Sequence, residues 1–127
     1  MRRVFKTLHF ARWMRKTALT NPALCKAVAE MAEGLIDADL GGDVVKKRVA
    51  LPGRGKSSGV RTLVATRRGT RWFFIFGFEK NDRANISDVE LDGLQSLALD
   101  LLARNGRELD EAIAEGVLLE ICHDHKN

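Results

Sequence analysis

The stretch of residues 44–83 constrains the fold most, because it holds three strand-like segments separated by turn residues. Residues 71–78, RWFFIFGF, are apolar at every position after Arg71, which predicts a central strand buried on both faces. Residues 44–51 and 60–66 have strand-like composition, and Arg67-Arg68-Gly69-Thr70 is typical of a hairpin turn. We therefore expect three consecutive antiparallel strands at the centre of the fold.

The same stretch carries most of the positive charge of the chain. It contains eleven Lys and Arg residues and two acids, a net charge of +9, whereas the whole chain of 127 residues carries +4. From residue 84 onward three Lys and Arg stand against ten acids. A basic sheet next to an acidic C-terminal part predicts a polyanionic partner.

Helices are predicted on both sides of this stretch. Residues 9–19 have apolar side chains at helical spacing, and Asn21-Pro22 predicts the cap and first turn of a second helix, so that the two form a hairpin. Residues 2–7 could add a short strand. Ser87 to Glu90 is a capping box, the helix that it opens is expected to close at Asn105-Gly106, and residues 108–115 and 117–121 predict a final helix and strand. The fold class is therefore α/β (α+β): a small antiparallel sheet packed against an N-terminal helical hairpin, with C-terminal helices, in one domain spanning residues 1–127.

Composition also limits where such a chain can act. No apolar run approaches the roughly 18 residues that span a bilayer, and the N-terminus lacks the apolar core of a signal peptide. Cys25 and Cys122 form no CxxC motif, which favours two free thiols in a reducing compartment. We expect a cytoplasmic protein without a membrane partner.

The cations of the basic stretch fall into a pattern. Alternation along the first strand puts Lys46 and Arg48 on one face and Lys47 on the other. Arg61 begins the next strand, and Lys80 follows the third. We expect a groove in which Lys46, Arg48, Arg61 and Lys80 converge, with further contacts to a nucleic-acid backbone from Arg54, Lys56 and Arg83.

Other motifs are less specific. The loop PGRGKSSG lacks the GxxxxGK[ST] spacing of a phosphate-binding loop. Asp37, Asp39 and Asp43 could hold a divalent metal ion, although capping and solubilising roles are favoured, so no metal or cofactor is predicted. His123 and His125 could bind a metal, act as acid or base, or belong to an inert tail, and His9 is interpreted as a surface residue.

The order of elements, together with the segments DADLGGDVVKKRVALPGRGKSSGVRT and FIFGFEKNDRANIS, resembles the RelE/HigB family of type II toxin–antitoxin toxins, in the RelE/ParE superfamily. The resemblance implies an RNase that cuts messenger RNA, commonly on the ribosome, and a cognate antitoxin that neutralises it in a hetero-oligomer. It implies catalytic roles for Lys46, Arg48, Arg61 and Lys80. Relatives carry a Lys-Arg pair where this chain has Lys80-Asn81, and Arg83 could replace the second cation. Many relatives also use a C-terminal Tyr or His; this chain has no Tyr, which leaves that role to His123 or His125.

The implied reaction is metal-independent cleavage by the RNA 2′-hydroxyl. Arg48 and Arg61 would hold the phosphate, and Lys46 or Lys80, crowded by other cations, would act as base. The alternative is a non-enzymatic basic module that binds nucleic acid or an acidic protein. A DNA-binding repressor is not favoured, because no helix-turn-helix with a basic recognition helix is present.

Overall fold

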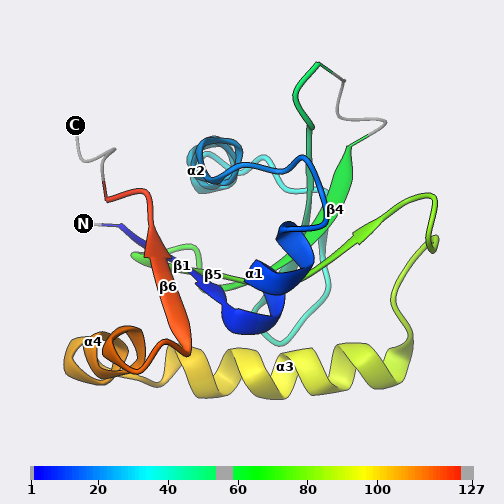
Figure 1. Cartoon of the computed structure of the whole chain (residues 1–127). Helices are drawn as coiled ribbons and strands as arrows, with labels where there is room; N and C mark the ends of the chain where they lie inside the picture. Colours follow the sequence, from blue (N-terminus) through cyan, green and yellow to red (C-terminus); the bar gives the residue numbers. More distant parts are fainter. Residues whose placement is uncertain (1, 54–58, 124–127) are drawn as a thin grey trace.

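The computed structural model describes residues 2–53 and 59–123, and Arg54, Lys56 and His125 lie outside these ranges. A six-stranded sheet has the order β2-β3-β4-β5-β1-β6. Figure 1 shows α2 on one side of the sheet and α3 on the other, with β6 beside α4. The elements are β1 (Arg3–Thr7), α1 (Leu8–Met14), α2 (Asn21–Ala32), β2 (Ala38–Asp39), β3 (Val44–Val49), β4 (Val60–Thr66), β5 (Arg71–Glu79), α3 (Asp88–Leu102), α4 (Gly106–Ala114) and β6 (Leu118–Ile121).

The predicted antiparallel order of β3, β4 and β5 is confirmed by the strand register. Strand β5 is central, as its apolar sequence predicts, and Trp72 to Ile75 are at most 1% exposed. Its second neighbour is β1, which pairs with it in parallel and separates it from the antiparallel edge strand β6. The sheet is therefore mixed, although most of its pairings are antiparallel.

Two apolar layers hold the helices onto the sheet. On one face Phe10 of α1 and Leu24 of α2 pack against Trp72 and Phe74. On the other face Leu101 of α3 and Leu109 of α4 pack against Phe5 and Phe73, whose rings stack at 4.9 Å. The N-terminal helical hairpin thus covers one face, as expected, and the C-terminal helices cover the other.

Helix α1 packs beside the part of β5 that is not paired with β1. Strand β1 pairs with β5 only as far as Phe74, and α1 lies next to the remaining part of β5. Gly77 makes this approach possible, because a Cβ atom at that position would lie 2.2 Å from the Trp13 ring. Helix α1 is therefore fixed through Trp13 against the end of the central strand.

Several predicted boundaries are wrong by a few residues. Helix α1 ends at Met14 and not near residue 19, and Thr20 caps α2 in place of Asn21. Residues 37–43, just before the basic stretch, contain the short strand β2, which was not predicted. Ser87 does form the predicted capping box of α3, whereas Asn105 caps α4 and does not close α3.

The two cysteines are not free thiols, contrary to our prediction. Cys25 of α2 and Cys122, which follows β6, form a disulfide with Cα atoms 5.6 Å apart. They are 97 residues apart in sequence, so their spacing carries no sign of the pairing. The antiparallel pairing of β6 with β1 brings the end of the chain to α2.

Candidate functional site

The predicted cations of β3 and β4 share one face of the sheet. Arg48 lies directly opposite Arg61, and Lys46 lies opposite Leu63 on the same face. Leu63 packs with α3, so this is the face that the C-terminal helices cover further along. We call Lys46, Arg48 and Arg61 the cationic face.

Lys47 points to the other face, as alternation along the strand predicts. It is 3% exposed, and its Nζ atom donates to the Leu35 carbonyl at 2.8 Å and pairs with Glu30 at 2.9 Å. Both partners lie on or just after α2. Lys47 is thus a structural residue that joins α2 to the sheet.

The two opposed arginines differ in their partners. Asp37 accepts a hydrogen bond from the Arg48 Nε atom at 3.1 Å and another from the Arg48 backbone N–H at 2.6 Å. Arg61 donates to the Gly59 carbonyl at 3.3 Å and has no carboxylate partner among the described residues. Like charges directly opposite each other on a sheet are unfavourable. An anion bound between these two guanidinium groups would relieve that repulsion.

Aromatic rings continue the face on β5. Phe78 lies opposite Arg61, and its ring is 6.4 Å from that of Phe76. The Arg83 guanidinium lies 5.7 Å from the centre of the Phe76 ring, and the His9 ring stacks on Phe76 at 5.6 Å. An exposed imidazole therefore lies on the same face as the cations.

Arg83 is held by the first turn of α3. Its Nη1 atom donates to Glu90 Oε1 at 2.6 Å, and Glu90 also accepts from the Ser87 backbone N–H at 2.8 Å. The Arg83 hydrogen bond and then the Ser87 N–H lower the pKa of Glu90 to about 2. Lys80 is exposed in the turn that follows β5 and forms no ion pair within the described ranges.

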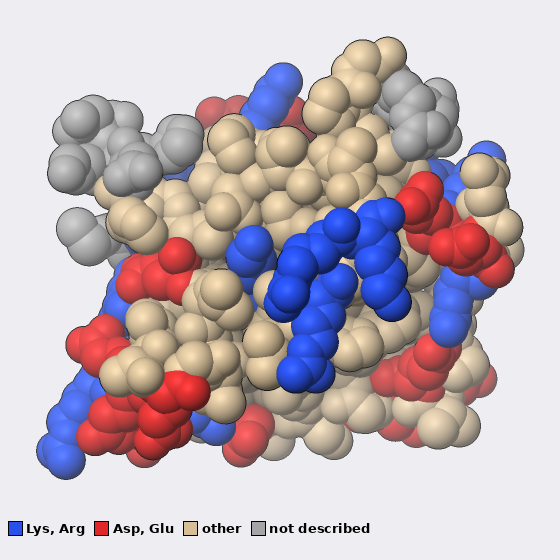
Figure 2. All heavy atoms as spheres, in the orientation of Figure 1, with Lys and Arg blue, Asp and Glu red and all other residues tan. Residues whose placement is uncertain are grey.

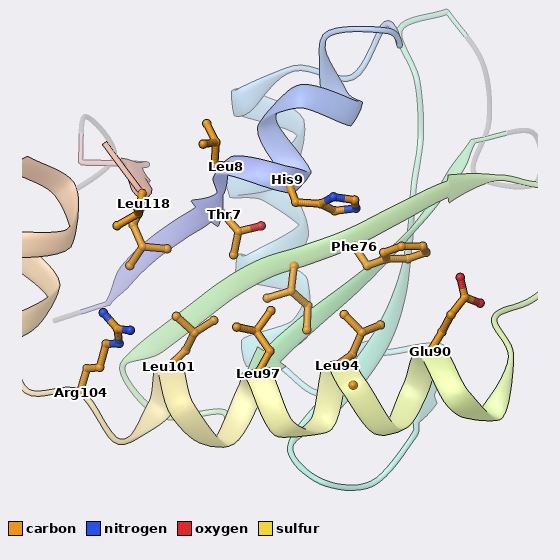
Figure 3. Close-up of a pocket in the computed structure, with 13 residues that line it drawn as sticks. Thr7, Leu8, His9, Phe76, Glu90, Leu94, Leu97, Leu101, Arg104 and Leu118 are labelled. Atoms are coloured by element: carbon orange, nitrogen blue, oxygen red, sulfur yellow. The ribbon is translucent and has the colours of Figure 1, made fainter. Parts of the chain in front are cut away.

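An apolar groove adjoins this face. It has a volume of about 560 Å³ and lies between α3, the middle of β5 and the start of α1, with His9 and Phe76 in its wall. Figure 3 shows Leu94, Leu97 and Leu101 pointing from α3 toward the sheet, with Glu90 and Arg104 at the ends of the row. Leucine side chains do not bind phosphate, so the row of leucines in this groove is not itself a phosphate site.

The family of the chain follows from a comparison with protein-family models. The model of the RelE toxin of the RelE/RelB toxin–antitoxin system matches residues 2–121. The chain belongs to the RelE toxin family. It is therefore the toxin of a toxin–antitoxin system, and a cognate antitoxin is its partner. A search of curated proteins gave no significant match.

In this RelE-family toxin the C-terminal histidine is not near the cationic face. His123 follows Ile121, which pairs with Val4, and Val4 pairs with Trp72 at the start of β5. Arg61 pairs with Phe78, six residues further along β5, or about 20 Å of strand. The disulfide of Cys122 holds this end of the chain to α2. The prediction that His123 acts as acid or base next to Arg61 is therefore not supported by its position, and His125 lies outside the described ranges.

Asp37, Asp39 and Asp43 each form an ion pair with an arginine in this toxin. Asp37 pairs with Arg48, Asp39 with Arg68 at 3.0 Å, and Asp43 with Arg67 at 3.1 Å. Over residues 2–53 and 59–123 no group of three or more His, Cys, Asp or Glu side chains could hold a metal ion. No helix within those ranges is long and apolar enough to cross a membrane.

Sequence reasoning missed His9 as a site residue. The imidazole belongs to α1, and the ring that it stacks on comes 67 positions later in the chain. The only available signal was indirect: Thr7 precedes His9 and caps α1, which fixes His9 in the first turn of the helix.

Proposed function

We propose that this toxin is an endoribonuclease that cleaves messenger RNA during translation in the cytoplasm. The observation that carries the proposal is the opposed pair Arg48 and Arg61 on an open sheet face, with Lys46 beside it. Two rigid guanidinium groups suit a phosphate, which they can bind through paired N–H donors.

In the proposed reaction the RNA 2′-oxygen attacks the adjacent phosphorus, and the bond from phosphorus to the 5′-oxygen breaks. The products are a 2′,3′-cyclic phosphate and a 5′-hydroxyl. One group takes the proton of the 2′-hydroxyl, and another gives a proton to the leaving 5′-oxygen. The charge that grows on the phosphate oxygens is stabilised by Arg61 and Arg48.

Proton transfer is assigned to residues on the same face. Lys46 and Lys80 remain candidates for the base, as the sequence predicts. His9 is a better candidate for the acid than His123, because it stacks on Phe76 within the face and is exposed. An imidazole can both accept and donate a proton near neutral pH. The ribosome would supply the alignment of the RNA that these groups alone do not give.

The same face offers the simplest means of control. An antitoxin that covers or distorts Lys46, Arg48 and Arg61 in a toxin–antitoxin hetero-oligomer would prevent phosphate binding. Copurification with the antitoxin should therefore yield a complex that does not cleave RNA.

Arg61→Ala tests the chemistry. Loss of one preorganised donor to the transition state should lower the cleavage rate by about 10²–10³-fold. Wild type and variant would be induced in cells, with primer extension to map new 5′ ends in messenger RNA and circular dichroism to check the fold. An occupancy mechanism would lose only a fraction of its effect, because one phosphate contact of several is removed. Growth arrest by the wild type without any new 5′ ends would reject cleavage in favour of the binding module.

A further inference from the structure

A second group of cations lies on and just after α1. The first 29 residues contain seven Lys and Arg and no acid. Arg12 in the last turn of α1, and Arg15 and Lys16 in the turn that follows, are all exposed. Figure 2 shows Lys and Arg gathered over α1, whereas Asp and Glu gather over α4. We call Arg12, Arg15 and Lys16 the α1 basic surface.

The charges of this surface are not balanced by neighbouring acids. Within the described ranges none of the three forms an ion pair, whereas Arg67, Arg68 and Arg107 each pair with a carboxylate. The pKa of Lys6, on the adjoining strand β1, reflects the same excess of positive charge. Burial and then the nearby Arg15 charge lower the pKa of Lys6. The surface therefore keeps a positive potential that a polyanion can use.

Structural roles account for little of this charge. A cation in the last turn of a helix is favoured by the helix dipole, which could explain Arg12. The effect falls off beyond the last turn, and α1 has only seven residues. The helix is already anchored by Phe10, Ala11 and Met14, which are buried. Neither the fold nor the helix requires three cations here.

The surface is continuous with the cationic face. His9 in the first turn of α1 stacks on Phe76, which lies on that face. Arg12 follows His9 by three positions, so it is the next residue on the same side of the helix. A nucleic-acid strand that leaves the cationic face past Phe76 would meet Arg12 and then the turn that carries Arg15 and Lys16.

We propose that the α1 basic surface binds the phosphate backbone of the RNA substrate beyond the cleaved bond. The partner is the same single strand that occupies the cationic face, since the two surfaces adjoin. The proposal rests on the proposed function only in taking RNA as the polyanion. Its role is to hold the strand in line with the site, and none of its residues takes part in bond breaking.

The test measures binding without cleavage. The probes are 2′-O-methyl RNAs of about 3 and about 12 nucleotides, which lack the attacking hydroxyl; the short one covers the cationic face alone. The variant Arg12→Gln/Arg15→Gln/Lys16→Gln should bind the longer RNA roughly tenfold or more weakly. For this variant the slope of log K against log salt concentration should be smaller in magnitude by about 2, the value expected for three phosphate contacts to a single strand. Binding of the short RNA should not change.

A matched control removes the same charge elsewhere. Arg67→Gln/Arg68→Gln/Arg107→Gln also lowers the net charge by three, but each of these arginines has an acidic partner. It should bind both RNAs like the wild type, and circular dichroism should show that both triple variants are folded. Equal weakening by the two triple variants would mean that net charge alone acts, and would overturn the proposal.

Two further outcomes are informative. One distinguishes substrate RNA from ribosomal RNA as the ligand of the α1 basic surface, and the other distinguishes failure of this proposal from failure of the proposed cleavage. A variant at the α1 basic surface that binds the long RNA normally but binds ribosomes poorly would overturn the substrate path in favour of ribosomal RNA. If unmodified RNA is never cut by the wild type, while the length-dependent loss of binding is still seen, the proposed cleavage fails and the RNA path stands.

Discussion

Strand β3 places three consecutive cations in two opposite situations. Lys46 and Arg48 lie on an open face opposite β4 residues, and Arg48 is more than two-fifths exposed. Lys47, between them, is buried with two oxygen partners. The same residue type one position away thus joins α2 to the sheet on one side of the strand and lies on the proposed RNA-binding face on the other. Charge alone does not indicate function; the face on which the charge lies does.

The largest expected effect is the difference in stability between single alanine variants of Lys47 and Lys46. Lys47→Ala removes a buried ammonium group that pairs with Glu30 and donates to the Leu35 carbonyl, which should lower the free energy of unfolding by about 3 kcal/mol. Lys46→Ala should change it by less than about 0.5 kcal/mol, because Lys46 is only partly buried and forms no ion pair among the described residues. Urea unfolding measures both values.

The activities of the two variants should rank the other way. RNA cleavage per folded molecule should survive Lys47→Ala and fall with Lys46→Ala. Equal stability of both variants would show that the buried ion pair contributes nothing, and the distinction between the two faces would fail.

The disulfide extends the comparison to the end of the chain. Cys122→Ser removes a bond that closes a loop of about 97 residues, which should cost roughly 2–4 kcal/mol of stability. His123 is remote from Arg61 in the sheet register, so cleavage by the folded variant should not change. Thermal unfolding with and without reductant gives the first quantity, and an RNA cleavage assay gives the second. A loss of cleavage without loss of fold would return the C-terminal histidines to the site.

Local patterns accounted for most of the fold and for the core of the candidate site. Alternation predicted the faces of Lys46 and Lys47, and the strand order predicted that Arg61 lies opposite β3. Pairings that join distant segments have no local signature. The parallel pairing of Val4 with Trp72 and the disulfide are of this kind, since each depends on how complete elements pack.

The same limit applies to the positions of His9 and His123. His9 stacks on Phe76 because α1 packs beside the part of β5 that β1 leaves unpaired, which no pattern within residues 1–20 reveals. His123 is remote because β6 runs antiparallel to β1, away from Phe78. The register of β6 and the disulfide of Cys122 together fix the position of His123.

The smallest expected effect concerns the pair of Arg83 and Glu90 at the border of the cationic face. The pKa of Glu90 falls from the ordinary 4.5 to about 2 in the folded protein, chiefly because Arg83 donates to it. At neutral pH the carboxylate is ionised in both the folded and the unfolded chain, and the pair contributes its full stabilisation. As the pH falls below about 4.5 the unfolded chain takes up the proton first, so the contribution declines until about pH 2.

Glu90→Gln should therefore be less stable than the wild type at pH 7, and this difference in the free energy of unfolding should be smaller at pH 3. Urea unfolding at pH 7 and pH 3 measures this difference in stability. Glu111→Gln is the control, because Glu111 lies on α4, away from the cationic face, and pairs there with the exposed Arg107 at a distance of 3.5 Å. A gap that stays constant between pH 7 and pH 3 would mean that the charge of Glu90 does not hold Arg83 over Phe76, and that the border of the face is set by packing alone.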